Sequence, residues 1–349
     1  MKKLFAIFSG AVLLLSCASQ KNFKSQPLYG HYLGELPCAD CSGMRTYIQL
    51  FPDFTYHKKT IYLDKADEVY TVKDSWKIVN DSVLVLNEQN NQQAYLYKKD
   101  KLTMLSQKRE IITGNLAYRY NLFKITDDST YKADFSNLKK NQVNFLGQGN
   151  EPFWSVEILS NQSLKLKQLG EEDIIFKIFE SNYKKDVSIF KAKNNAASIT
   201  FKIYNFPCIN DMSGAQADKY VELIEPNKIL KGCGYILQED FELAGKWHLS
   251  YMKDETIKQV AQEKLLFINF QTESKQLNGN LGCNNFGATY SINNHSIKIE
   301  KIISTMMACP ALTIEQKFSE ALQKTNHFML VDGKLNFFNG QSLLLSFTR

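Results

Sequence analysis

Short runs of alternating apolar and polar residues, separated by turn residues, follow one another from residue 29 onwards. The run at residues 46–50 alternates, and a second run over 55–63 follows a turn. Two further hairpins are predicted, with turns at residues 80–81 and 98–100. Turn residues at this spacing are typical of an all-β barrel or sandwich, so the pattern predicts a mainly β fold for this part of the chain.

The rest of the chain divides into two more β-rich units. A polar stretch without a sustained period predicts a linker at residues 125–142, and a β-rich middle domain follows at 143–240. The last unit, residues 241–349, is predicted to contain strands and one helix. This helix has Thr313 as its predicted N-cap and Gln316 at the reciprocal position of a capping box. Its apolar residues repeat on one face: Ile314, Phe318, Ala321 and Leu322.

The composition fits several β-rich domains and excludes other classes of protein. Of the 349 residues, 44% are hydrophobic and 12% aromatic, which favours strands and allows two or three separate cores. The mean hydropathy of −0.31 excludes a polytopic membrane protein. The net charge of +6 is small for this length and is not gathered into one patch, so we expect no nucleic-acid partner.

The first residues predict export and a lipid anchor. A positive start is followed by an apolar run at residues 4–15, which is too short to span a membrane and suits a signal-peptide core. The run ends in Leu-Leu-Ser-Cys, which resembles the bacterial lipobox, so residues 1–16 are predicted to be cleaved and Cys17 to be lipidated. Residues 17–26 would form the tether. Because Ala18 replaces the aspartate typical of inner-membrane retention, we expect an outer-membrane protein that faces the periplasm.

The seven cysteines divide into one lipidation site and three local pairs. Six cysteines allow fifteen pairings, so the sequence leaves the connectivity open. The pairs suggested by spacing are Cys38 with Cys41, Cys208 with Cys233, and Cys283 with Cys309. Closing either of the two longer loops would stabilise the fold by about 3 to 4 kcal/mol, whereas the first pair closes almost no chain. The first pair therefore calls for a chemical explanation.

The Cys38-x-x-Cys41 motif allows a redox dithiol, a soft-metal site or a structural disulfide at a loop. A proline precedes the motif and a β-patterned run follows it, which argues against an oxidoreductase whose cysteine begins a helix. Thiolates with a thioether favour Cu(I), and Met44 lies three positions beyond the second cysteine. His31 and His57 are possible further ligands. A disulfide clip is the alternative, because oxidising compartments favour the closed form.

Other residues carry less chemistry. The cluster at residues 151–154 is interpreted as a packing corner rather than the lining of a ligand cleft. Met306 and Met307, close to Cys309, are interpreted as core filler beside a disulfide rather than as a second soft-metal site. The sequence contains no Ser-His-Asp order, glycine-rich phosphate loop, His-Glu-x-x-His or Ca²⁺ loop, so nothing in it indicates an enzyme.

Residues 29–46, which read YGHYLGELPCADCSGMRT, resemble the N-terminal domain of the NlpE family of copper-resistance and envelope-stress lipoproteins. The resemblance implies a small lipocalin-like β-barrel at residues 27–124. It also implies a role in surface sensing and in activating an envelope stress response. The chain departs from the family in having Phe54 in the turn where glycine is usual, and Met44 where an aliphatic residue is common.

The C-terminal third resembles a second family. The segments LAGKW at 243–247, GNLGCNNF at 279–286 and TMMAC at 305–309 are similar to the META domain of the HslJ family. This implies an α+β domain with an antiparallel sheet, one helix and no accepted catalytic activity. The middle unit resembles a periplasmic module through residues 149–154 and 208–214, and no function is established for that module.

The sequence thus predicts a non-catalytic outer-membrane lipoprotein in envelope stress response or copper resistance. In this hypothesis Cys38 and Cys41 bind Cu(I), with help from Met44, or switch between thiol and disulfide. The expected partners are the outer membrane and an envelope-stress signalling protein. Two alternatives remain: a lipocalin-like carrier of an apolar ligand, and a structural protein that binds other envelope components.

Overall fold

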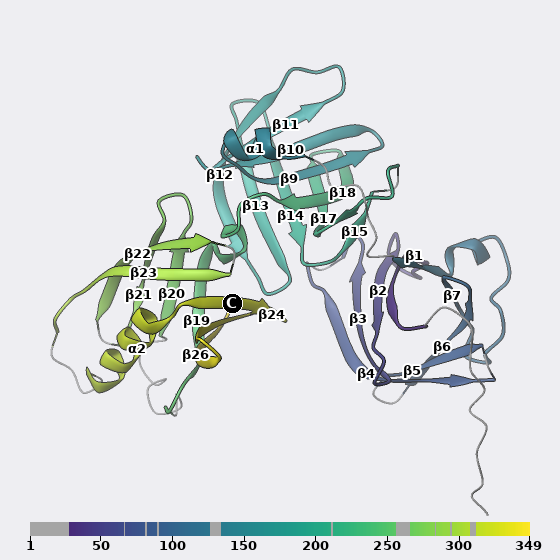
Figure 1. Cartoon of the computed structure of the whole chain (residues 1–349). Coiled ribbons are helices and arrows are strands. Elements are labelled where there is room, and N and C mark those ends of the chain that lie inside the picture. Colours follow the sequence, from purple (N-terminus) through teal and green to yellow (C-terminus); the bar gives the residue numbers. More distant parts are fainter. Residues whose placement is uncertain are drawn as a thin grey trace, which may run out of the picture.

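Three closed eight-stranded β-barrels follow one another along the chain in the computed structural model (Figure 1). The structure describes residues 28–65, 67–80, 82–88, 91–125, 134–210, 212–255, 266–282, 284–293, 295–307 and 312–349. The strands are antiparallel and follow the order of the sequence around each barrel, so all three have an up-and-down topology. The predicted mainly β fold is confirmed. Within the described ranges, no helix is both long and apolar enough to cross a membrane.

The first barrel closes where β1 pairs with β8. Its strands are β1 (Gly30–Leu36), β2 (Met44–Leu50), β3 (Thr55–Tyr62), β4 (Tyr70–Val79), β5 (Val83–Glu88), β6 (Asn91–Lys98), β7 (Lys101–Met104) and β8 (Asn121–Ile125). A 3₁₀ turn, η1 (Ala117–Arg119), lies before the last strand. The predicted hairpins occur as expected, and Asn80 and Lys99 take positive φ angles of 52° and 53° in their turns.

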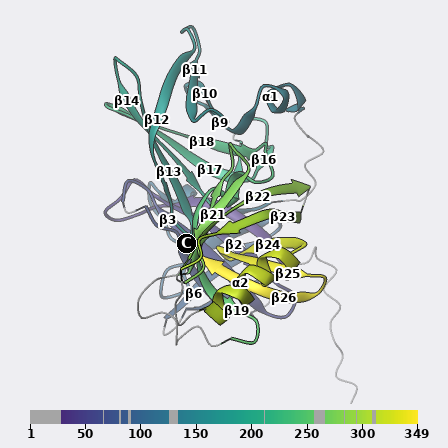
Figure 2. The ribbon, with the colours of Figure 1, turned by 90° about the vertical axis from the view of Figure 1, so that its left-hand side faces the viewer.

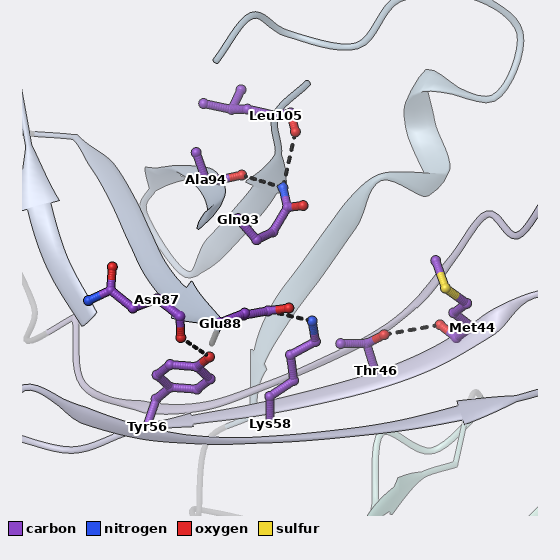
Figure 3. A network of polar contacts seen from close by, with 9 residues as sticks. All are labelled: Met44, Thr46, Tyr56, Lys58, Asn87, Glu88, Gln93, Ala94 and Leu105. Atoms are coloured by element: carbon purple, nitrogen blue, oxygen red, sulfur yellow. Dashed lines mark hydrogen bonds and ion pairs between the residues drawn. The ribbon is translucent and has the colours of Figure 1, made fainter. Parts of the chain in front are cut away.

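Large side chains fill the interior of the first barrel. Its buried cluster consists of Tyr32, Leu36, Ile48, Leu50, Tyr56, Trp76, Leu84, Leu86, Tyr95, Leu102 and Leu122. Polar contacts accompany this cluster (Figure 3): the Lys58 ammonium lies 2.6 Å from the Glu88 carboxylate, and the Tyr56 hydroxyl donates to the Asn87 carbonyl oxygen at 2.6 Å. A carrier of this architecture would hold its ligand in the barrel interior, so this packing does not support the carrier alternative.

The middle barrel closes where β18 pairs with β9. Its strands are β9 (Val143–Asn150), β10 (Phe153–Leu159), β11 (Ser163–Gln168), β12 (Ile174–Tyr183), β13 (Val187–Lys193), β14 (Ser198–Tyr204), β17 (Lys219–Glu225) and β18 (Lys228–Ile236). A two-stranded hairpin, β15 (Cys208–Ile209) and β16 (Gln216–Ala217), is inserted before β17.

A short helix replaces part of the predicted linker. Helix α1 (Ser136–Lys140) precedes β9, and Phe135 and Leu138 pack against Val143 and Leu237 of the middle barrel. The prediction missed this element because two apolar residues within a polar stretch are too few to establish a helical period. The remaining part of the predicted linker, residues 126–133, lies outside the described residues.

The third barrel contains the predicted helix. Its strands are β19 (Gly245–Met252), β20 (Phe267–Gln271), β21 (Gln276–Asn280), β22 (Asn285–Asn293), β23 (Ser296–Ser304), β24 (His327–Val331), β25 (Lys334–Asn339) and β26 (Ser342–Thr348). Helix α2 (Leu312–Lys324) lies between β23 and β24 in sequence and packs beside β23 and β25 (Figure 2). Phe318 and Leu322 are fully buried. Thr313 lies inside the helix, one residue after its first position, rather than at the predicted N-cap.

Neighbouring barrels contact one another through a cation–π contact, an ion pair and a shared apolar cluster. A 3₁₀ turn, η2 (Phe241–Leu243), leads into the third barrel. The guanidinium carbon of Arg349 lies 4.2 Å from the ring centre of Trp247 in this barrel and 4.8 Å from that of Tyr183 in the middle barrel. Lys73 of the first barrel pairs with Asp332 of the third at 2.5 Å. One apolar cluster joins the first and middle barrels and includes Leu33, Ile61, Leu63, Val69, Ile125, Val187, Ile189 and Phe206.

Candidate functional site

The Cys38-x-x-Cys41 motif forms the loop between β1 and β2 at one rim of the first barrel. Strand β1 ends before Pro37, which has no N–H to contribute to the sheet. The structure joins Cys38 and Cys41 in a disulfide with a Cα–Cα distance of 5.3 Å, and both cysteines are partly exposed. The motif therefore lies on a solvent-accessible loop beside the sheet and not at the start of a helix.

Asp40 completes a small group of ligand atoms with the two cysteines. Among the described residues, Cys38, Asp40 and Cys41 form the one group of three whose ligand atoms all lie within 4.8 Å of one another. Asp40 also pairs with Lys65, and the hydrogen bond from Lys65 is the main cause that lowers the pKa of the Asp40 carboxyl. As a disulfide the sulfurs offer no thiolate. Once reduced they would provide two soft donors, which suit Cu(I).

The other predicted ligands lie elsewhere in the first barrel. Met44 packs against the interior cluster, and its carbonyl oxygen accepts a hydrogen bond from the Thr46 hydroxyl at 3.3 Å (Figure 3). The Nδ1 atom of His31 lies 2.6 Å from the Tyr47 hydroxyl oxygen. His57 packs edge-on against the ring of Phe51. Neither histidine belongs to the group around the two cysteines.

The second predicted pair of cysteines is also joined. Cys208 of β15 and Cys233 of β18 form a disulfide with a Cα–Cα distance of 5.4 Å, and both are buried. Cys17, Cys283 and Cys309 lie outside the described residues, so the lipidation site and the third pair stay predictions.

Met306 and Met307 correct an interpretation of the sequence. Met306 is 98% exposed and Met307 is half exposed, so the interpretation as core filler is wrong. The buried positions are taken instead by polar groups. The Asn284 side chain donates to the Glu315 carboxylate at 2.7 Å and accepts from the Met307 N–H at 2.8 Å. This network fixes the backbone after β23 and leaves the methionines facing solvent.

The aromatic cluster before β10 also differs from its interpretation. Trp154 is buried in the middle barrel, as a packing corner requires, but Phe153 is 48% exposed. The two rings lie on successive residues of a strand and therefore point to opposite faces.

Arg45 is a residue that the sequence analysis missed. Its position between Met44 and Thr46 on β2 makes it an outward-facing residue, since the side chains of a strand alternate. Its guanidinium carbon lies 4.5 Å from the ring centre of Tyr220, and its Nη2 donates to the sulfur of Cys208 at 3.5 Å. An arginine in an otherwise ordinary strand gave no signal of this contact, because the partner is far away in sequence.

Comparison with known families places two domains in the chain. The family model of the NlpE N-terminal domain matches residues 32–115, which lie in the first barrel, and that of the META domain matches residues 240–349, which form the third. By its fold, the protein therefore belongs to the class of proteins built from consecutive β-barrel domains. This chain contains an NlpE N-terminal domain and a META domain. Neither is a family of enzymes.

Two solved structures are similar to this chain over part of its length. A protein described as a lipoprotein of Shewanella oneidensis is 33% identical, with a TM-score of 0.25, over 28% of this chain and 87% of its own. The Cpx pathway activator NlpE from Escherichia coli is 15% identical, with a TM-score of 0.23, over 58% of this chain and 94% of its own. The comparison with curated proteins finds no match.

Proposed function

We propose that this protein is a non-catalytic lipoprotein of the bacterial cell envelope that responds to copper or to redox state through Cys38 and Cys41. In this proposal Cys17 carries the lipid that anchors the protein to the outer membrane, with the barrels in the periplasm. The observation that supports it most directly is the partly exposed cysteine pair on the first loop of an NlpE N-terminal domain.

The loop suits a reversible change. The disulfide closes a loop of sequence separation 3, and so short a closure adds little to the stability of the barrel. Opening it would therefore change the loop and leave the sheet intact. Cys38 Sγ lies 3.5 Å from an Asp40 carboxylate oxygen, whose negative charge would disfavour a thiolate after reduction. The ion pair with Lys65 offsets that charge and keeps thiolate formation accessible.

The rim around the loop offers a surface for a signalling partner. Glu35, at the end of β1, pairs with Arg119 at 2.9 Å and so connects this rim to the segment before β8. In that segment Tyr118 is 73% exposed, and Leu116 and Ile111 are also exposed. We propose that an envelope-stress signalling protein contacts this apolar surface and senses the state of the cysteine loop.

A Cu(I) titration tests the metal-binding part of the proposal. The reduced full chain should bind one Cu(I) in an anaerobic competition titration against a chromophoric chelator. That binding should disappear in the double variant Cys38→Ser/Cys41→Ser, because both soft donors are lost. Met44→Leu is the matched control. Since Met44 packs into the interior cluster, this variant should bind as the unaltered protein does.

The outcomes separate the two modes of response. Copper binding that persists in the double serine variant would contradict the metal site. If the reduced protein binds no Cu(I), while the Cys38–Cys41 pair exchanges reversibly with a glutathione buffer, the redox mode stands alone. Carrier function would instead require an apolar molecule to co-purify with the protein.

A further inference from the structure

Two motifs of the middle domain meet at one end of its barrel. Asn150 ends β9, and Asn210 follows the buried cysteine of β15, sixty residues further along the chain. The Asn150 side-chain amide donates to the Asn210 side-chain oxygen at 3.0 Å. The same oxygen accepts the backbone N–H groups of Met212 at 3.1 Å and Ser213 at 3.0 Å. The disulfide to Cys233 then ties this loop to β18.

Arg45 of the first barrel lies against this end of the middle barrel and helps to line a pocket of about 60 Å³. The pocket also touches Asn150, Asn210 and Lys231, so both barrels contribute to it. The Nη2 atom of Arg45 donates to the Cys208 sulfur and the guanidinium group lies over the Tyr220 ring, but the Nε atom is buried and has no hydrogen-bond partner among the described residues. A buried donor without an acceptor is costly, which points to an occupant that accepts a hydrogen bond.

The charges select the kind of occupant. The described residues that line the pocket include two cations, Arg45 and Lys231, and no carboxylate. Within the described part of the chain neither cation forms an ion pair. Glu222 does not line the pocket, and its carboxylate accepts hydrogen bonds from the hydroxyls of Tyr204 at 3.0 Å and Tyr220 at 3.1 Å. An anion in the pocket would therefore meet positive charge and unused donors.

We propose that Arg45 and Lys231 bind an oxyanion, either a carboxylate or a phosphate group, at the joint between the first and middle barrels. The pocket volume is several times what one water needs, which suits such a group and is too small for a sugar or an aromatic ring. Arginine is well adapted to this ligand because Nε and one Nη can donate to two oxygens at once. The inference does not depend on lipidation or on copper.

Ligand binding at this place would tighten the joint. Arg45 belongs to β2 and Lys231 to β18, so the site is complete only while the two barrels are in contact. A ligand that binds only the joined arrangement stabilises it by mass action. The oxyanion would thereby couple the position of the first barrel, which carries the cysteine loop, to the middle barrel.

Thermal unfolding and NMR of the full chain test the proposal. Sodium phosphate or sodium acetate should raise the melting temperature above that in sodium chloride at equal ionic strength and pH. The same anion should shift the Nε–H signal of Arg45 in a ¹⁵N correlation spectrum, with a midpoint that gives its affinity. The preferred probe identifies the ligand chemistry: acetate represents a carboxylate, and phosphate a phosphate group.

Variants decide whether the two cations form the site. Arg45→Gln and Lys231→Gln should each weaken anion binding about tenfold, since each removes one charge-assisted contact. Lys228→Gln on the same strand changes the net charge equally and should bind as the unaltered protein does, because Lys228 pairs with Glu225. Lys231 is exposed, so Lys231→Gln should leave the fold intact. Its effect on anion binding can therefore be measured even if Arg45→Gln disrupts the contact between the two barrels. Equal responses to phosphate, acetate and chloride, or an unchanged affinity in Lys231→Gln, would overturn the site and leave a joint filled by water.

Discussion

Single residues set how closely the strands of the middle barrel approach one another. A Cβ atom added at Gly149 would lie 2.3 Å from the Trp154 indole nitrogen and 2.6 Å from the carbonyl oxygen of Lys231. At Gly232 it would lie 2.1 Å from the carbonyl oxygen of Gln148. These glycines leave room for the Trp154 indole beside the two strands, which explains why a glycine and a tryptophan share one motif.

Gly149→Ala should therefore destabilise the middle barrel by about 1–3 kcal/mol, because the added methyl group overlaps an indole and a backbone oxygen. Denaturant unfolding followed by tryptophan fluorescence measures this, since each barrel buries one tryptophan, and a variant that keeps only Trp154 reports on the middle barrel alone. Gly287→Ala on β22 of the third barrel is the control, followed in a variant that keeps only Trp247, the buried tryptophan of that barrel. Nothing lies within 4 Å of its added Cβ, so we expect almost no change. Equal effects of the two variants would contradict the packing argument.

At this scale the sequence predicted residues whose role depends on their near neighbours. Cys38 and Cys41 stand on one loop, and local spacing was enough to single them out. The contacts of Arg45 and the exposure of Met307 were not predicted, because their surroundings depend on segments far away in sequence. A methionine close to a cysteine resembles core filler, but here Asn284, 23 residues earlier, holds the Met307 N–H and the methionine side chain faces solvent.

The elements themselves were largely predictable from the pattern of apolar residues. The hairpin turns and the face of α2 follow from periods of two and of about 3.6 residues. The resemblance to the NlpE family led us to expect a barrel in the first unit, and the structure closes it between β1 and β8. Closure of the middle and third units was not predicted, since it depends on pairing between strands that are far apart in sequence. Helix α1 was missed because its stability comes from Phe135 and Leu138 packing on the middle barrel and not from its own sequence.

Helix α2 completes the core of the third barrel, where β23 and β24 share the single pair Ser296 and His327. Phe318→Ala should lower the free energy of unfolding of this barrel by about 3–5 kcal/mol, because the fully buried ring leaves a cavity. Hydrogen exchange of β23 and β25 should rise accordingly. Gln316→Ala, on the exposed side of the helix, should leave exchange unchanged. A small effect of Phe318→Ala would mean that the helix is not part of the core.

At the scale of the whole molecule, three barrels of one topology are joined by contacts of different chemistry. The first and middle barrels share an apolar cluster, while Arg349 stacks between aromatic rings of the third and middle barrels. The first and third barrels are joined by the ion pair of Lys73 and Asp332. Because both partners are largely exposed, this pair contributes little stability and is the contact that solution conditions change first.

The Lys73–Asp332 contact should depend on acid. The hydrogen bond from Lys73 is the main cause that lowers the pKa of Asp332. The pair therefore persists above the ordinary aspartate value of about 3.9 and is lost as the pH falls through the lowered pKa. An NMR titration of the Asp332 carboxyl carbon should show this depressed midpoint, and Lys73→Met should move it back up. A midpoint that does not change in the variant would show that the two barrels do not meet through this pair in solution.

The up-and-down topology has a consequence for how the chain folds. Nearly every strand pairs with the next one in sequence, so most of each barrel can form from hairpins soon after its residues become available. Only the closing pair of each barrel, such as β1 with β8, joins residues almost a hundred positions apart. A polypeptide that enters a compartment end first could thus assemble its sheets progressively. The slow step in each barrel would be the pairing of its first and last strands, which must find each other across the whole unit. Three closures over about a hundred residues each replace the single closure over the whole chain that one larger barrel of the same strands would need.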